Sequence, residues 1–292
     1  MILLVVIICN FQLMLSQELS PYIKVGVTTN GMQQAYNDVV KALAGNGFKV
    51  LGSYHPAKKK SLKVLVFTRS DLQNTVVKVQ DRGALAAAQK IGFQRKNGQI
   101  IISYTNPDYM LRAYLRDDYN KYKRTFDKFH SDLKSALSVI GNDFTPFGGK
   151  VSANKLKKYH YKIMMPYFTD PVELKNFSSY KEGEKTILSN LERHKSGTKL
   201  VYKLSYPSKN ITVFGVALYS NDSASEAYFL PRIGEEHIAA LPYEIILQGN
   251  QATMLHGKYR FALFWPKLSM GQFMKIMSTP GKIEDILKSL CE

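Results

Sequence analysis

Four side chains in the second half of this 292-residue chain are of the types that transfer protons or bind metal ions. They are His160, Glu236, His237 and His256. A carboxylate beside an imidazole can serve as a general acid and base, or as part of a hard-metal site. If the four converged, they would form a metal-assisted catalytic site. The alternative is that Glu236 and His237 cap an element, and that His256 lies on a strand with its side chain on the same face as Lys258.

A basic and aromatic segment, KLKKYHY at Lys155–Tyr161, precedes most of them. Lysines neutralise phosphate or sulfate groups, and aromatic rings stack on bases or sugars. The segment therefore predicts an anion-binding surface. Alternatively, it is an edge strand whose lysines point to water and prevent pairing with another chain. The candidate ligand-binding residues are Lys157, Lys158, Tyr159 and Tyr161.

The sequence contains none of the common linear motifs of hydrolases and nucleotide-using enzymes. There is no glycine-rich phosphate loop, no Gly-x-Ser-x-Gly and no His-Glu-x-x-His. The chain has only two cysteines, Cys9 and Cys291, and a thiolate zinc site needs several, so none is expected. We predict no cofactor and no dedicated metal site, although an active site assembled from distant residues leaves no linear trace.

The formal net charge is +17, and hydrophobic residues make up 45% of the chain. This hydrophobic content is sufficient for buried cores. A strongly basic chain is attracted to anions such as phosphates, anionic lipids or acidic glycans. Because the lysines are spread along the sequence, a basic surface that is simply well solvated is the alternative.

The N-terminal segment has no charged side chain and contains the apolar run ILLVVII. The apolar stretch is shorter than the roughly 20 residues that a membrane-spanning helix needs, so no stable membrane span is expected. It is typical of the core of a secretory signal peptide. We predict a signal peptide over residues 1–16 and export to the periplasm or the exterior, with a membrane-retained anchor as the alternative. Nucleic acid is then not an expected partner.

The elements that would position these residues begin with a β-hairpin. Asn97-Gly98 lies between two apolar-alternating runs, which is the strongest local signal of a hairpin. Upstream, Pro21–Thr29 alternates like a strand, and Gly31–Asn46 has apolar residues at helical spacing. Residues 21–115 thus predict a first unit with helices on one face of an antiparallel sheet, which is an α+β fold.

Residues 116–154 are interpreted as a long helix, Arg116–Ile140, followed by a linker rich in glycine. The helix is predicted from a stripe of aromatic and leucine side chains. After the linker, a second unit with C-terminal helices is predicted over residues 155–292, and it begins with a strand at Leu156–Met165.

The second unit repeats the order of the first. A looser hairpin is expected at residues 249–250, and Pro207 follows Pro56 by nearly the same interval as Ala240 follows Ala88. A constant interval of this kind is what an internal duplication leaves in a sequence.

Two motifs, AGNGFKV at residues 44–50 and NGQIIISYTNP at residues 97–107, carry a resemblance to a known family. Residues 21–115 resemble the domain-of-unknown-function family 302, and residues 155–268 are similar to a degenerate second copy. The whole chain also looks like a set of uncharacterised bacterial proteins with this domain. The resemblance implies an α+β sandwich that often self-associates, for instance as a homodimer, with no established activity or catalytic residues.

From the sequence we expect an exported protein of two similar α+β units. We expect it to bind an anionic small molecule or an envelope polyanion in a cleft between the units, without turnover. Two alternatives stay open. One is a metal-assisted enzyme that uses the histidines of the second unit, and the other is a structural, self-associating envelope component.

Overall fold

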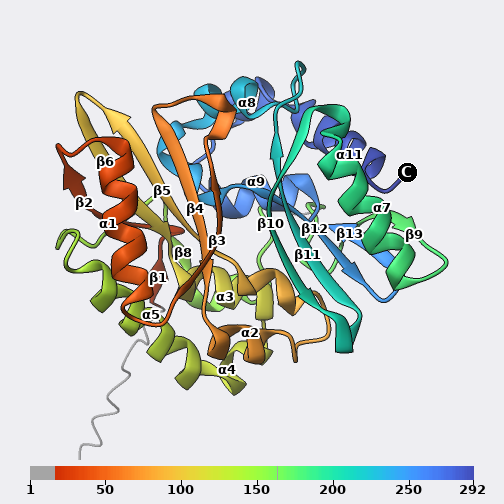
Figure 1. Cartoon of the computed structure of the whole chain (residues 1–292), viewed down its shortest axis with the longest axis horizontal. Helices are drawn as coiled ribbons and strands as arrows, with labels where there is room; N and C mark the ends of the chain where they lie inside the picture. The colour runs from red at the N-terminus through yellow and green to blue at the C-terminus, as the bar shows by residue number, and fades with distance from the viewer. Residues whose placement is uncertain (1–16, 163) are drawn as a thin grey trace, which may run out of the picture.

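Two antiparallel sheets lie beside each other in the computed structural model, which describes residues 17–162 and 164–292 (Figure 1). The signal peptide predicted for residues 1–16 lies outside the described residues. Within those residues, no helix combines the length and the apolar character that crossing a membrane requires.

The first sheet has its strands in the order β3-β4-β5-β6-β2-β7, and all neighbouring pairs are antiparallel. Every residue of β4 is buried, because both faces of the sheet are covered. The strands are β2 (Tyr22–Thr28), β3 (Lys49–Tyr54), β4 (Leu62–Thr68), β5 (Gln89–Lys96), β6 (Gln99–Thr105) and β7 (Thr145–Phe147).

The second sheet has the order β10-β11-β12-β13-β9 and is also antiparallel. Its strands are β9 (Val172–Asn176), β10 (Thr198–Tyr206), β11 (Ile211–Leu218), β12 (Tyr243–Gln248) and β13 (Gln251–Met254). Apart from β7, the two sheets have the same strand order along the chain and in space. The α+β fold of two similar units is confirmed, while their origin by duplication stays our inference.

Both predicted hairpins are present. Asn97 and Gly98 join β5 to β6 with φ angles of 51° and 77°, the positive values that a type I′ turn requires. The turn between β12 and β13 includes Gly249, with a φ of 57°. Counted from the two turns, the last six residues of β5 have counterparts in β12, so that Gly92 corresponds to Glu244.

Each sheet carries an amphipathic helix on its outer face: α1 (Met32–Ala44) on the first and α7 (Tyr180–Glu192) on the second. The two helices lie on opposite sides of the molecule in Figure 1. Helix α1 buries Met32, Ala35, Val39 and Leu43, which recur at helical spacing.

The inner faces of the two sheets are turned toward each other. Phe93 of β5 packs against Tyr36 of α1, with ring centroids 6.1 Å apart. Successive residues of a strand lie on alternate faces of the sheet. Lys90 and Gly92 are therefore on the face opposite to Phe93, which is turned away from α1 and toward the second unit. A Cβ on Gly92 would lie 2.8 Å from the side chain of Ile238, which shows how closely the second unit approaches the first sheet.

Each unit places a short segment against the sheet of the other. Ile238 belongs to η5 (Glu235–Ala240), a 3-10 helix of the second unit that packs on β4, β5 and β6. The hydroxyl of Thr105 donates a hydrogen bond of 2.6 Å to the carbonyl of Ala239 in η5. Reciprocally, η2 (Gly83–Ala87) of the first unit contacts β11 and β12. The units therefore share one continuous core.

The helix predicted at Arg116–Ile140 is wrong at its start. The structure has α3 (Pro107–Leu115), α4 (Asp118–Lys121) and α5 (Lys123–Leu137). Pro107 is the first residue of α3. The helix begins here because the Asn106 side chain accepts a hydrogen bond from the Asp108 backbone N–H, and because proline suits the first helical turn. Arg116 then adopts a φ of 52°, which ends α3.

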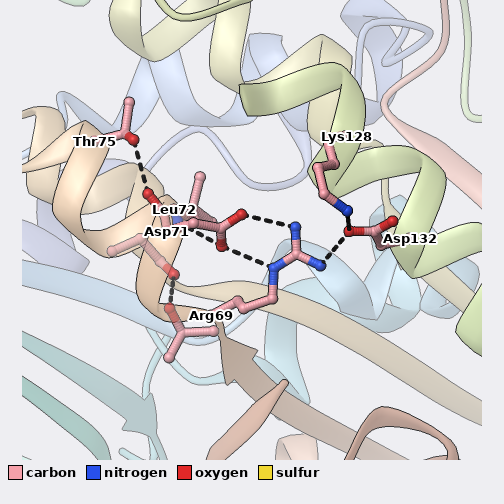
Figure 2. A network of polar contacts seen from close by, with 8 residues as sticks. Arg69, Asp71, Leu72, Thr75, Lys128 and Asp132 are labelled. Atoms are coloured by element: carbon pink, nitrogen blue, oxygen red, sulfur yellow. Dashed lines mark hydrogen bonds and ion pairs between the residues drawn. The ribbon is translucent and has the colours of Figure 1, made fainter. Parts of the chain in front are cut away.

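Helix α5 is tied to the first sheet by the polar network of Figure 2. Arg69, which precedes α2 (Ser70–Val76), donates to Asp71 and to Asp132 of α5 at 2.7 Å. Lys128 also donates to Asp132. The Arg69 guanidinium lies over the ring of Phe48, 4.8 Å from its centroid. The network thus combines charge pairing with aromatic packing.

The segment predicted as a linker is partly built into the first unit. Strand β7 pairs with β2, and β8 (Val151–Ser152) pairs with β1 (Glu18–Leu19). The predicted strand Leu156–Met165 is absent: α6 (Ala153–Leu156) and irregular backbone occupy its described residues. Tyr159 is buried there and donates to the carbonyl of Ala262, which binds this segment to a helix and not to a sheet.

The remaining helices belong to the second unit: α8 (Glu226–Ile233), α9 (Gly257–Phe264), α10 (Met270–Met274) and α11 (Thr279–Ser289). Helix α9 contacts the first unit directly. Tyr109 of α3 donates to the carbonyl of Leu263 at 2.7 Å, and Tyr22 of β2 donates to that of Phe264 at 2.8 Å.

A buried cluster of charges lies between the units. Lys90 of β5 is 2.5 Å from Glu244 of β12, and both side chains are almost fully buried. Arg260 of α9 lies 3.8 Å from the same carboxylate and stacks on the ring of Tyr243 at 3.8 Å. Burial lowers the pKa of Lys90, and the charge of Glu244 opposes this effect. The carboxylate of Glu244 is therefore shared by two buried cations.

We predict that Glu244→Gln destabilises the protein more than Lys90→Met. The first change leaves Lys90 and Arg260 buried without their common carboxylate, which should lower the free energy of unfolding by about 3–5 kcal/mol. The second change leaves Glu244 paired with Arg260 and should have a smaller effect. Urea unfolding at pH 7 measures both, with the exposed Glu192→Gln as control. An equal or larger loss in Lys90→Met would contradict this assignment.

Candidate functional site

A wide cleft with a volume of about 1210 Å³ is formed by residues of both units. The first unit contributes the start of α1, the residues around η1 (Pro56–Lys58) and Arg95 at the end of β5. The second unit contributes residues around η3 (Lys195–Gly197) and Tyr219 after β11. Nearby, β3 and β10 approach so closely that a Cβ on Gly52 would lie 2.0 Å from the carbonyl oxygen of Val201.

The charged side chains among the described residues that line the cleft are all basic, with no aspartate or glutamate. Five of them are lysines or arginines, and none forms an ion pair with any described residue. They are Lys58, Lys60, Lys63, Arg95 and Lys199. The cleft therefore has a positive potential that the protein itself does not neutralise.

Lys63 is the most unusual of these cations. Its residue is only 8% exposed, and its Nζ lies 3.9 Å from the centroid of the Tyr36 ring. Burial lowers the pKa of Lys63. A lysine that is buried without a carboxylate is rare, and such groups are concentrated at functional sites.

The N-terminus of α1 opens into the same cleft. Gly31, the N-cap residue, has no side chain to accept hydrogen bonds from the first turn, and that turn contains no acidic residue. Gly31, Met32 and Gln33 all line the cleft. Free backbone N–H groups at a helix N-terminus, together with the helix dipole, favour an anion.

One wall of the cleft is held by a buried carboxylate. Glu226 of α8 accepts hydrogen bonds from the Tyr54 hydroxyl at 2.9 Å and from the Ala57 backbone N–H at 2.9 Å. Burial raises the pKa of Glu226 to about 7. Lys58, which follows Ala57, lies over the ring of Tyr219 at 5.2 Å. Glu226 thus connects the second unit to the loop that carries Lys58 and Lys60.

The lysines predicted to bind a ligand lie elsewhere. Lys157 and Lys158 line a separate cavity of about 190 Å³. Tyr159 lines the same cavity, and its buried hydroxyl donates to the carbonyl of Ala262. Tyr161 lines a different, apolar cavity. Three of the four residues thus lie at one small cavity, and none of the four lines the basic cleft.

The structure brings together only two of the four predicted catalytic residues. Nδ1 of His237 lies 3.8 Å from Oε1 of Glu236. His160 packs against Tyr167, and His256 is the N-cap of α9, where its Nδ1 accepts from the Lys258 backbone N–H. The prediction that His256 lies on a strand is wrong, because β13 ends at Met254. Among the described residues, no group of three His, Cys, Asp or Glu side chains could hold a metal ion.

The environment of His237 is aromatic. Its ring lies 5.2 Å from that of Tyr22 and 6.0 Å from that of Trp265. Burial lowers the pKa of His237, and the charge of Glu236 opposes this effect. A neutral imidazole can accept a proton, but none of the described residues that line the adjoining cavity is a serine, threonine or cysteine that it could activate.

A cleft between the units was expected from the sequence, but the residues that line it were not identified, although one signal was present. Lys58, Lys59 and Lys60 form a run of three lysines, a pattern that is also typical of an exposed turn. Lys59 pairs with Glu235 of η5, whereas Lys58 and Lys60 line the cleft. Lys63, Arg95 and Lys199 are far from this run in sequence, and only the folded chain brings them near it.

Comparisons with known proteins give little further information. No family model matches the chain, and no curated protein matches it. Among solved structures, the chain is similar to an uncharacterised conserved DUF302 protein from Bacillus stearothermophilus, with 16% identity and a TM-score of 0.33. The match covers 40% of this chain and 94% of the other. At this TM-score the likeness says nothing about function, export or duplication.

The raised pKa of Glu226 predicts a specific pH dependence of stability. In the unfolded chain this carboxyl titrates near its ordinary value of 4.5, and in the folded protein near 7. Between these pH values the folded state retains a proton that the unfolded state has lost, so stability falls as pH rises. The loss is at most about 1.4 kcal/mol per pH unit, or on the order of 3 kcal/mol in total.

Glu226→Gln should remove this pH-dependent contribution to the free energy of unfolding, because glutamine does not titrate. Urea unfolding at several values between pH 4.5 and pH 8 should give a flatter profile for Glu226→Gln than for the wild type. Glu192→Gln, on the exposed end of α7, should keep the wild-type profile. Parallel profiles for wild type and Glu226→Gln would show that the pKa of Glu226 is not raised.

Proposed function

We propose that this protein binds an anionic ligand in the basic cleft between its two units, without turnover. Lys63 carries the proposal, because it is a nearly buried cation without a carboxylate partner that lines this cleft. A bound anion would supply the countercharge that Lys63 lacks. The N-terminus of α1, which no side chain caps, independently favours a negatively charged ligand.

The size of the cleft favours a ligand with several negative charges. Ligand cavities commonly have volumes of roughly 300–1,000 Å³, and this cleft, at about 1210 Å³, is larger. The five cations come from both units. A polyphosphate, or a segment of an acidic or sulfated glycan, could contact several of them at once. The half-buried ring of Tyr219, which carries Lys58 over one face, also lines the cleft and offers an aromatic surface to a sugar.

The side chains of the cleft support binding more than catalysis. Nδ1 of His55 lies 2.7 Å from the carbonyl of Leu62, and Nδ1 of His194 lies 3.0 Å from that of Thr198. Each imidazole is thus oriented by the backbone, and no carboxylate lines the cleft to form an acid–base pair with it.

We further propose that the chain is exported and that its ligand belongs to the cell envelope. The uncharged apolar segment at residues 1–16 supports export. Envelope polymers are rich in phosphate and carboxylate groups, which fit the charge of the cleft. The proposal of binding in the cleft does not depend on this location.

Binding of inorganic tripolyphosphate, measured by isothermal titration calorimetry, tests the proposal. Lys63→Met retains the apolar stem of the side chain and removes its charge, so affinity should fall about tenfold or more. Lys58→Gln/Lys60→Gln should weaken binding further, and added salt should weaken it in the wild type.

The matched control is Lys157→Gln/Lys158→Gln, which removes two positive charges outside the cleft. It should leave the affinity for tripolyphosphate nearly unchanged. If this control loses affinity while Lys63→Met does not, the ligand site is at the segment first identified in the sequence. If neither tripolyphosphate nor dextran sulfate binds, the proposal is wrong.

A further inference from the structure

The apolar cavity that Tyr161 lines is separate from the basic cleft and differs from it in chemical character. Its volume is about 210 Å³, and it lies between α9, α10 and the irregular segment after α6. Its walls are apolar, with contributions from Met165, Phe261, Trp265, Leu268 and Phe273. It shares no residue with the basic cleft.

The surface around this cavity is apolar as well. Eight large apolar side chains are strongly exposed among the described residues, and six of them lie within 161–167 or 270–277. These two segments meet at the cavity, because Tyr161 and Met165 line it from one side and Met270 and Phe273 from the other. Exposed apolar patches of this kind mark binding sites.

The polar groups of the cavity have one sign of charge. Lys162 and Lys258 line it, and no aspartate or glutamate does. Neither lysine forms an ion pair with a described residue. The apolar walls would accept a hydrocarbon chain, while the two ammonium groups would attract an anionic head group.

We propose that this cavity binds an anionic amphiphile, with its apolar chain against Trp265 and Phe273 and its head group near Lys162 and Lys258. A cavity of about 150 Å³ can hold benzene, so 210 Å³ is sufficient for part of a medium-length chain. Methionine side chains, such as Met165 and Met270, adapt to chains of varying shape.

Trp265 is the only tryptophan of the chain and lines both this cavity and the one beside His237, so quenching of its fluorescence detects binding and the lysine variants locate it. The probe is 11-bromoundecanoate, whose bromine quenches tryptophan fluorescence on contact. Below the micelle concentration, we expect saturable quenching in the wild type. Lys162→Gln/Lys258→Gln should weaken binding about tenfold or more, because the head group loses its charged partners.

The matched control is Lys181→Gln/Lys185→Gln on the exposed face of α7, which lines neither cavity and should leave the affinity unchanged. Decyltrimethylammonium, a cationic amphiphile, should not compete with the probe. Equal binding of the cationic amphiphile, or no effect of Lys162→Gln/Lys258→Gln, would overturn the proposal.

Two other occupants of the apolar surface are tested in the same series. Association with anionic vesicles but not with free 11-bromoundecanoate would identify a membrane-docking face and overturn the proposal. A stable dimer that dissociates in Met270→Asp, with no quenching by the probe, would identify a contact between two copies of the chain and would also overturn it.

Discussion

The shared carboxylate of Glu244 is the interaction on which the arrangement of the two units depends. Lys90 approaches it from the first unit and Arg260 from α9 of the second, in a region that excludes water. Charges in such a region require partners at short distance, because their hydration has been lost. The requirement fixes the position of β5 against β12 more strictly than apolar packing alone, which tolerates small shifts of one surface over another.

The basic cleft requires that the two units keep a fixed position relative to each other, because both units contribute residues to its lining. Glu226 fixes the wall of the cleft in a similar way. It accepts hydrogen bonds from the Tyr54 hydroxyl and the Ala57 backbone N–H across the boundary between the units. Lys63, in contrast, has no carboxylate partner among the described residues. Burial lowers the pKa of the Lys63 ammonium, and an anion in the cleft would oppose this effect. The site is thus organised before any ligand arrives.

Local signals in the sequence were sufficient for most of the fold. The Asn97-Gly98 turn and the apolar periodicity of α1 specify their elements without help from the rest of the chain. Signals that depend on tertiary contacts were misread. The segment containing Tyr159 alternates in a way that fits a strand, but its contact with α9 decides its structure. His256 resembles a residue within a strand, yet β13 ends before it because α9 must begin there. The residues that line the cleft could not be predicted, since Lys63, Arg95 and Lys199 come together only through the packing of the units.

The buried charges have a consequence for which halves can associate. Counted from the hairpin turns, Lys90 corresponds to Pro242, and Glu244 corresponds to Gly92. Two copies of the first unit, paired in the same way, would place the lysine opposite a glycine, with no carboxylate to receive it. Two copies of the second unit would leave the glutamate opposite a proline. The buried charges therefore favour pairing of a first unit with a second unit over pairing of either unit with a copy of itself.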